Sequence, residues 1–140
     1  MKKIGAFIFI LFLMNTCINN DVAENHNCDY KTIISLAQYQ NAPSDNLTIN
    51  SLKIENECLI INFSSSGCDG QSWEVNLIDS GNVYNDNPLQ RNLRLSLKNK
   101  ELCEAYITKE LSFDISNLKV EGHKIQLNLI NSGKSLLFEY

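Results

Sequence analysis

The sequence predicts an all-β domain, an antiparallel β-sandwich of about seven strands. Three observations indicate this fold. Apolar and polar residues alternate along several segments, turn-forming residues separate those segments, and the cysteines after the N-terminal region are even in number. Alternation is typical of half-buried strands, and many short strands joined by tight turns are typical of a sandwich. A small closed β-barrel of the same strands is the alternative.

Alternation with a period of two runs through five segments. An amphipathic helix would place apolar residues three and four positions apart, and these segments do not. We therefore expect strands with one face in the core and one in solvent. The phase of Trp73 predicts a core position, and a role in stacking against a ligand is the alternative. The alternating apolar residues are Leu59, Ile61 and Phe63; Trp73, Val75 and Leu77; Leu93, Leu95 and Leu97; Ile125, Leu127 and Leu129; and Leu136, Phe138 and Tyr140.

Turn-forming residues predict two hairpins. Residues 55–57, Glu-Asn-Glu, separate an apolar-rich segment at 47–54 from the strand that begins at Cys58. Residues 131–134, Asn-Ser-Gly-Lys, separate the last two strands and predict a type I turn with a glycine bulge.

Other segments are less regular. Residues 64–70 contain two glycines and predict a loop. Residues 79–90 are expected to be the longest irregular stretch, because Pro88 disfavours a central strand there. Residues 106–115 predict one bent strand or two short ones. Residues 30–40 allow either a short N-terminal helix or an edge strand.

The N-terminus has the form of an export signal. Lys2 and Lys3 precede eleven uncharged residues, 4–14, which match the core of a signal peptide. A membrane-spanning helix needs about 20 apolar residues, so this run is too short to be one. The sequence therefore predicts a signal peptide at residues 1–16.

The end of this apolar run predicts where the signal is cut. Residues 13–17, Leu-Met-Asn-Thr-Cys, resemble a bacterial lipobox, in which a peptidase cuts just before a cysteine that then carries lipid. Lipidation at Cys17 is the prediction, with residues 17–27 as a polar tether and residues 28–140 as one domain. Ordinary secretion with a cut after Ala23, or an uncleaved anchor, are the alternatives. A lipid on Cys17 predicts attachment to a bacterial membrane of the cell envelope, most simply the outer membrane.

The net charge of the chain limits which kinds of molecule are expected as partners. The chain has 12 basic and 16 acidic residues, and a cut before Cys17 removes Lys2 and Lys3, so the net charge becomes 10 − 16 = −6. An acidic surface disfavours nucleic acid as a partner. The expected partners are the membrane, through the lipid, and a protein of the envelope.

The cysteine count predicts two disulfides. Without Cys17, four cysteines are left in an exported chain, and three connectivities are possible. A zinc site is disfavoured because no Cys-x₂-Cys pair occurs. No metal and no cofactor are expected. The four cysteines are Cys28, Cys58, Cys68 and Cys103.

Candidate catalytic groups are sparse, so we expect no enzyme. The two histidines are His26, in the tether, and His123, at a turn, and both are interpreted as surface residues. The serines at 64–66 lack the strand-to-helix turn of a nucleophile elbow.

Acidic residues are spread along the sequence, and two groups of them are candidate sites. A carboxylate pair for glycosidase-like catalysis would have to come from Glu101, Glu104, Glu110 and Asp114. These residues are interpreted as ordinary acidic residues around an exposed strand. Residues 79–87 are rich in oxygen ligands but lack the EF-hand spacing, so a solvated loop is expected. Glu74 is expected to pair across strands with Arg94 or Lys98.

Two cysteine motifs in the C-terminal two-thirds carry a family resemblance. One strand ends in Ser66-Gly67-Cys68, and a later segment reads Cys103-Glu104-Ala105. With residues 73–77, 93–97, 113–118 and 138–140, this succession resembles uncharacterised lipoproteins of Bacteroidetes-type bacteria. It resembles more distantly the C-terminal β-sandwich of NigD-like lipoproteins, in which a second glycine precedes the cysteine and a histidine follows it.

The resemblance implies a β-sandwich, an envelope location and a disulfide between Cys68 and Cys103. Cys28 would then pair with Cys58. It implies no activity, so the expected function is that of a non-catalytic binding or structural module anchored in the envelope. The alternative is a protein inhibitor of a cationic enzyme such as lysozyme.

Overall fold

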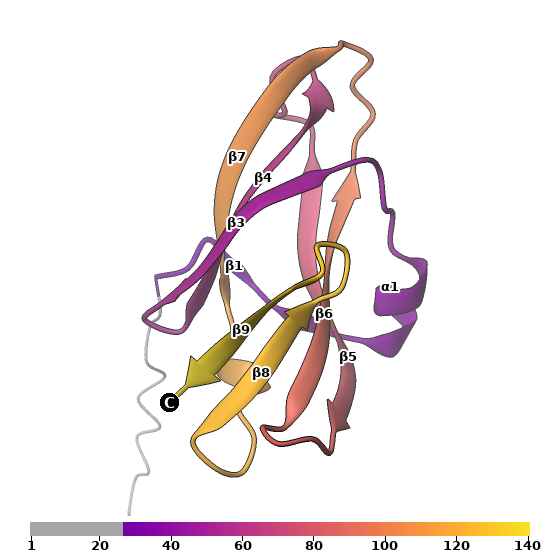
Figure 1. Cartoon of the computed structure of the whole chain (residues 1–140). Helices are drawn as coiled ribbons and strands as arrows, with labels where there is room; N and C mark the ends of the chain where they lie inside the picture. The colour runs from indigo at the N-terminus through magenta and orange to yellow at the C-terminus, as the bar shows by residue number, and fades with distance from the viewer. Residues whose placement is uncertain (1–26) are drawn as a thin grey trace, which may run out of the picture.

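The computed structural model describes residues 27–140, as two twisted sheets packed face to face (Figure 1). The all-β sandwich is therefore confirmed, and the two sheets are separate rather than closed into a barrel. Three predictions, the signal peptide at 1–16, the lipid on Cys17 and the place of His26 in the tether, lie outside the described residues. Within residues 27–140, no helix is long and apolar enough to cross a membrane.

The two sheets contain nine strands in total, where about seven were expected. Sheet A contains, in spatial order, β1 (Tyr30–Lys31), β7 (Ala105–Asp114), β4 (Cys58–Gly67) and β3 (Thr48–Glu55). Sheet B contains β2 (Ile33–Ile34), β5 (Glu74–Tyr84), β6 (Gln90–Lys98), β8 (Lys124–Leu129) and β9 (Lys134–Glu139). A short helix, α1 (Leu36–Asn41), lies beside β5, and a 3-10 turn, η1 (Ser116–Leu118), follows β7 (Figure 1).

Both predicted hairpins are confirmed. The turn between β3 and β4 places Asn56 and Glu57 at φ values of 48° and 64°, the left-handed backbone that a tight two-residue hairpin requires. The turn between β8 and β9 places Gly133 at φ 65°, which glycine adopts without steric cost.

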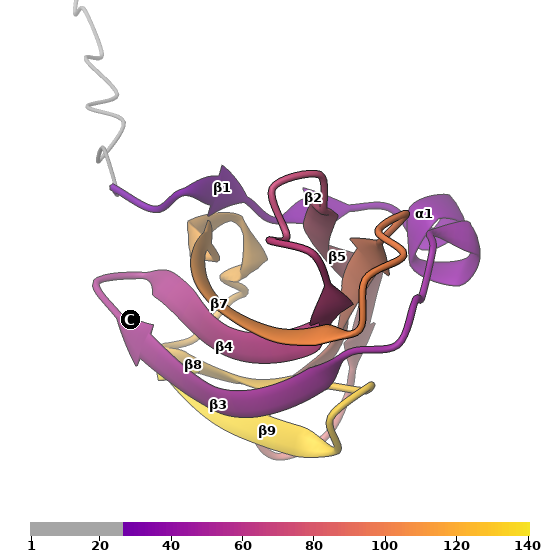
Figure 2. The same cartoon turned by 90° about the horizontal axis from the view of Figure 1, so that it is seen from above.

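The sheets are mixed, which corrects the antiparallel prediction. The chain crosses from sheet A to sheet B through β1 and β2 (Figure 2). β1 pairs in parallel with the last two residues of β7, and β2 pairs in parallel with two residues in the middle of β5. β6 and β8 are also parallel, because the chain visits sheet A as β7 between them. Residues 30–40 were expected to form either a helix or an edge strand, and they contain both. The short edge strands β1 and β2 come first, and α1 begins directly after them, with Ser35 as its N-cap.

Two predicted loops are partly strand. Residues 64–66 belong to β4, because Ser64 hydrogen-bonds Thr108 and Ser65 donates to the carbonyl of Asn46. Residues 79–84 belong to β5, where pairing with β6 is interrupted by an irregularity after Asp79 and resumes at Val83 and Tyr84. Residues 106–114 lie in the single strand β7, which is one of the two alternatives for residues 106–115, and Ile115 follows the strand.

The core lies between the inward faces of the two sheets, where the alternation placed it. Trp73 is 9% exposed, which confirms its core position. Each fully buried large apolar side chain contributes about 1.5–3 kcal/mol relative to an exposed one. The buried side chains include Leu59, Ile61, Phe63 and Phe113 from sheet A, and Leu77, Leu93, Leu95, Leu97, Ile125, Leu127, Leu129 and Phe138 from sheet B.

Candidate functional site

Disulfides lie at both ends of β4, and they are the two pairs expected. Cys28 is bonded to Cys58, at the start of the strand, and Cys68 to Cys103, just beyond its end. A strand rises about 3.3 Å per residue, so ten residues hold the two disulfides about 30 Å apart. The N-terminal end of the described chain is thus tied to one pole of the sandwich, and the second disulfide lies at the other.

The pole at Cys68–Cys103 consists of two loops, residues 68–73 and 99–104, which we call the tip. The carboxylate of Glu101 connects them. Its Oε2 accepts from the backbone N–H of Cys68 at 2.6 Å and of Gly70 at 3.0 Å, and its Oε1 accepts from the Ser72 hydroxyl at 2.8 Å. Charge-assisted hydrogen bonds of this kind are stronger than neutral ones, so Glu101 holds the first loop to the second.

Two glycines make this arrangement possible. A Cβ on Gly67 would lie 2.5 Å from Oε2 of Glu101, so a larger residue would displace the carboxylate. Gly70 has φ +71°, and a Cβ there would lie 2.7 Å from Cε of Lys109. The Lys109 ammonium donates to the carbonyl of Gly70.

Asn99 fixes the second loop. Its side-chain amide donates to the carbonyl of Ser66 at 2.7 Å, and its side-chain oxygen accepts from the N–H of Glu101 at 2.9 Å. The N–H of Asn99 donates to the Asp45 carboxylate at 2.7 Å. The loop that carries Cys103 is therefore anchored to the first loop and to the segment before β3.

Glu101 predicts a specific acid sensitivity. Burial acts to raise its pKa, but hydrogen bonds from the Ser72 hydroxyl and from the N–H groups of Gly70, Cys68 and Ser72 outweigh this and lower the pKa from 4.5 to about 2. A depressed carboxyl pKa contributes stability that is present above pH 4.5 and is lost as the pH falls towards 2. Urea denaturation across this pH range should show that the free energy of unfolding of the wild type falls as the pH is lowered, and that this fall is absent from Glu101→Gln. Equal pH dependence in the two proteins would contradict the role assigned to Glu101.

The tip presents an apolar side chain on this anchored frame. Leu102 is 96% exposed, directly between Glu101 and Cys103, and Tyr106 nearby is 69% exposed. A single exposed leucine is ordinary on a protein surface. Here its neighbours on both sides are fixed, one by five hydrogen bonds to the facing loop and one by a disulfide. Little conformational entropy would be lost when Leu102 enters a partner's pocket.

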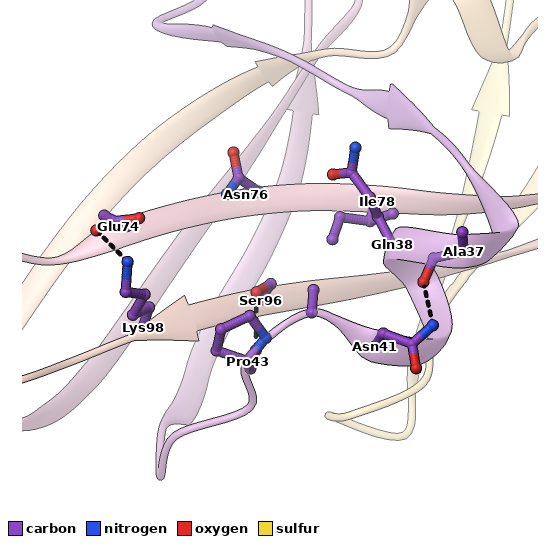
Figure 3. Close-up of a pocket in the computed structure, with 10 residues that line it drawn as sticks. Ala37, Gln38, Asn41, Pro43, Glu74, Asn76, Ile78, Ser96 and Lys98 are labelled. Carbon is purple, nitrogen blue, oxygen red and sulfur yellow. Dashed lines mark hydrogen bonds and ion pairs between the residues drawn. The ribbon is translucent and has the colours of Figure 1, made fainter.

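A groove of about 460 Å³ lies on the outer face of sheet B, beside α1 (Figure 3). Its floor includes Asn76 and Ile78, Gln38 projects over it from the helix, and Glu74 and Lys98 close one end with an ion pair of 2.7 Å. This confirms the expected cross-strand pair. The groove offers amide groups and a small apolar floor, and its ionised groups neutralise each other.

Arg94, the other expected partner of Glu74, has a different role. Its guanidinium donates to the carbonyls of Tyr39 and Ala42, each at 2.6 Å. Because the last carbonyls of a helix lack partners within it, Arg94 satisfies the end of α1 and fastens it to sheet B.

The sequence-selected acidic residues are dispersed. Glu101 serves the tip, Glu104 is exposed beside Cys103, and Glu110 accepts from Asn62 on the outer face of sheet A. Asp114 accepts from the N–H of Ser116. Between residues 27 and 140, no three His, Cys, Asp or Glu side chains gather in a metal-binding arrangement.

The oxygen-rich segment 79–87 is a solvated loop only in part, because residues 79–84 belong to β5 while residues 85–87 are exposed and lie outside the strands. Asp79 is completely buried and its carboxylate accepts from Arg91 at 3.0 Å and from the N–H of Gly81 at 2.6 Å. Burial raises the pKa of Asp79, although the Gly81 N–H and Arg91 act to lower it. Asp86, further along, accepts from Gln90. His123 is exposed, as expected.

Sequence reasoning missed the bond network of Glu101 and the buried pair of Asp79 and Arg91. A faint signal existed for the first, because glycines at 67 and 70 enclose Cys68 and an acidic residue precedes Cys103 by two positions. Nothing local in the sequence distinguishes Asp79 from the other aspartates.

Comparison with known proteins shows the fold alone. No protein family and no curated protein matches the chain. A solved protein described as toxin-related, from Parabacteroides distasonis ATCC 8503, aligns with a TM-score of 0.54 and 16% identity over 79% of this chain and 60% of its own. A protein of unknown function, DUF1344, from Bacteroides vulgatus ATCC 8482 aligns with a TM-score of 0.51 and 18% identity over 79% of this chain and 56% of its own. The chain thus spans less than two thirds of either structure, and its fold is similar to that of Bacteroidetes proteins of unknown function.

Proposed function

We propose that the protein is an exported, lipid-anchored lipoprotein of the bacterial envelope, and that it is a non-catalytic module binding a protein partner through the tip. The observation that carries the proposal is the position of Leu102. It projects from a hydrogen-bonded, disulfide-linked frame at the pole opposite to Cys28. A lipid on Cys17, eleven residues before Cys28, would attach the membrane to the pole opposite to the tip and leave the tip accessible.

The anchor makes a direct prediction. Cells grown with a labelled fatty acid should incorporate the label into the wild-type protein and not into Cys17→Ser, because the thiol is the acylation site. The same variant should leave the membrane fraction. Label that persists in Cys17→Ser would show that lipidation at this position is wrong.

The binding surface is tested by a matched pair of charge substitutions. Leu102→Asp places a carboxylate in the proposed contact, and Leu137→Asp does the same on β9, at a leucine that is 47% exposed. Both should fold like the wild type, since neither side chain is in the core. Affinity capture from envelope extract should recover a discrete protein with the wild type and Leu137→Asp, and at least about tenfold less with Leu102→Asp, the loss expected of one anchor residue.

The inhibitor hypothesis is favoured by one further feature of the same tip. Glu104 is exposed close to Leu102, on a protein whose net charge after cleavage would be 10 − 16 = −6. A cationic enzyme would meet both a fixed apolar side chain and a complementary potential. Lysozyme activity measured with and without excess domain decides this: inhibition that Leu102→Asp abolishes supports it, and unchanged activity removes it.

A further inference from the structure

One side of the sandwich has two unpaired strand edges that face each other. β1 pairs with β7 only at Phe113 and Asp114, and β2 pairs with β5 only at Ile78 and Asp79 (Figure 2). The edge of β7 over residues 105–111 and that of β5 over residues 74–77 therefore have no neighbouring strand within the described part of the chain. Their outward N–H and C=O groups have no backbone or side-chain partner there.

Other edges of the same sheets are covered by specific groups. The side-chain amide of Asn131 bonds both the N–H and the C=O of Leu95 on β6. The N–H of Asp45 donates to the carbonyl of Leu97, further along the same strand. The Lys134 ammonium donates to the carbonyls of Ile49 and Asn50 on β3. Exposed edges are often blunted in such ways or by inward-pointing charges. On β7 the inward-pointing charge is Lys109, whose ammonium is already held by the carbonyl of Gly70.

The open edges border a cleft of about 370 Å³. Glu74, Val75 and Asn76 line it from β5, Lys109 and Leu111 line it from β7, and Tyr30, Gln71 and Trp73 complete it. The Lys109 ammonium lies 5.4 Å from the centre of the Trp73 ring and is already bonded to the Gly70 carbonyl. The cleft thus combines apolar side chains, the polar groups of Gln71, Glu74 and Asn76, and two rows of backbone groups.

We propose that this cleft binds an extended peptide segment of another protein, which pairs with β7 as an added strand. Only an extended backbone offers donors and acceptors that alternate at the spacing of a strand edge. Residues 105–111 provide about 23 Å of edge at 3.3 Å per residue, room for about seven peptide residues. Alternate side chains of the peptide would enter the cleft against Val75, Leu111 and Trp73. Apolar groups are expected there, beside the polar groups of Gln71, Glu74 and Asn76.

The site is separate from the Leu102 contact and does not depend on it. Both could serve one partner, because β7 begins three residues after Leu102. Separate variants therefore test the Leu102 contact and the cleft, so that a negative result for one says nothing against the other.

The probe is a random heptapeptide library displayed on phage, selected against the purified disulfide-bonded protein. Recovered peptides should carry apolar residues at alternate positions. They should bind Leu111→Lys at least about tenfold more weakly, because the substitution removes an apolar contact and adds a second ammonium to the inner face that Lys109 already occupies. Glu110→Lys, the matched lysine on the outer side of the same strand, and Leu102→Asp should both bind as the wild type does. Thermal denaturation of each variant checks its fold.

Backbone pairing has its own readout. With peptide at about ten times its Kd, amide hydrogen exchange along residues 105–111 should slow about tenfold, since only about a tenth of the sites stay open. Trp73 is the single tryptophan, so its fluorescence should change in the same titration. The proposal is wrong if no selected peptide distinguishes Leu111→Lys from wild type, or if the bound peptides leave exchange at 105–111 unchanged.

Discussion

Replacing Cys68 and Cys103 together with serine is expected to lower the free energy of unfolding by roughly 4 kcal/mol. The two cysteines are 35 residues apart in the sequence, and the chain-entropy model assigns about that value to a disulfide that closes a loop of this length. A domain of this size is stable by about 5–15 kcal/mol, so the variant would retain only a fraction of its stability. Urea denaturation followed by circular dichroism measures the change.

The Cys28 and Cys58 pair provides the control. Its separation of 30 residues predicts nearly the same loss of stability. Partner binding should differ, however, because only the Cys68–Cys103 bond fixes the backbone beside Leu102. A Cys28→Ser, Cys58→Ser variant that loses partner binding as severely as the tip variant, under conditions where both are folded, would argue against the tip.

Arg91→Met is expected to cost about 3–5 kcal/mol, the usual penalty for leaving a buried charge without its partner. Asp79 is 0% exposed and Arg91 is 8% exposed, so water cannot replace the lost guanidinium. The Oδ2 of Asp79 and the Nε of Arg91 have no hydrogen-bond partner among the described residues, which leaves the pair little further compensation. Thermal or urea denaturation at neutral pH measures the loss.

Two comparisons isolate the buried charge from lost packing. Adding Asp79→Asn to Arg91→Met should recover part of the stability, because no ion is then buried. Lowering the pH should also reduce the penalty of Arg91→Met, since protonation neutralises Asp79. A penalty that is independent of pH and additive in the double variant would show that packing, not the ion pair, determines the effect.

The sequence predicts the strands whose burial follows the two-residue period. Leu59 to Phe63 and Leu93 to Leu97 each present every second side chain to the core, so their pattern is local and readable. β1 and β2 are two residues long and contain too little sequence for a period. Their parallel pairing is set by the crossover between sheets, which is a tertiary property.

Two segments that the sequence predicts to be loops form strands, because polar residues in them find partners in the folded protein. Ser64 and Ser65 resemble loop residues by composition, but their hydroxyls find partners on neighbouring segments, which removes the cost of burying them. Asp79 is tolerated inside β5 for the same reason, because Arg91 lies across the strand pair. Compensation between distant residues cannot be recognised in a local pattern.

The candidate site was predicted in part. The cysteine count predicts two disulfides, and the family resemblance implies the pair at the tip. The role of Glu101 depends on three backbone N–H groups from residues 68–70, about thirty positions earlier, and on space left by Gly67. Such a network requires the folded loops, so the same glutamate could only be considered as one of four candidate carboxylates.

Residue-specific photocrosslinking in intact cells tests the central claim most directly. A photoreactive amino acid is placed at position 102 in one strain and at position 137 in another, and crosslinked products are separated by size and identified. We predict one discrete protein adduct from position 102 and none from 137, because only the tip contacts the partner. Adducts from 137 with none from 102 would contradict the claim that this protein binds through its tip.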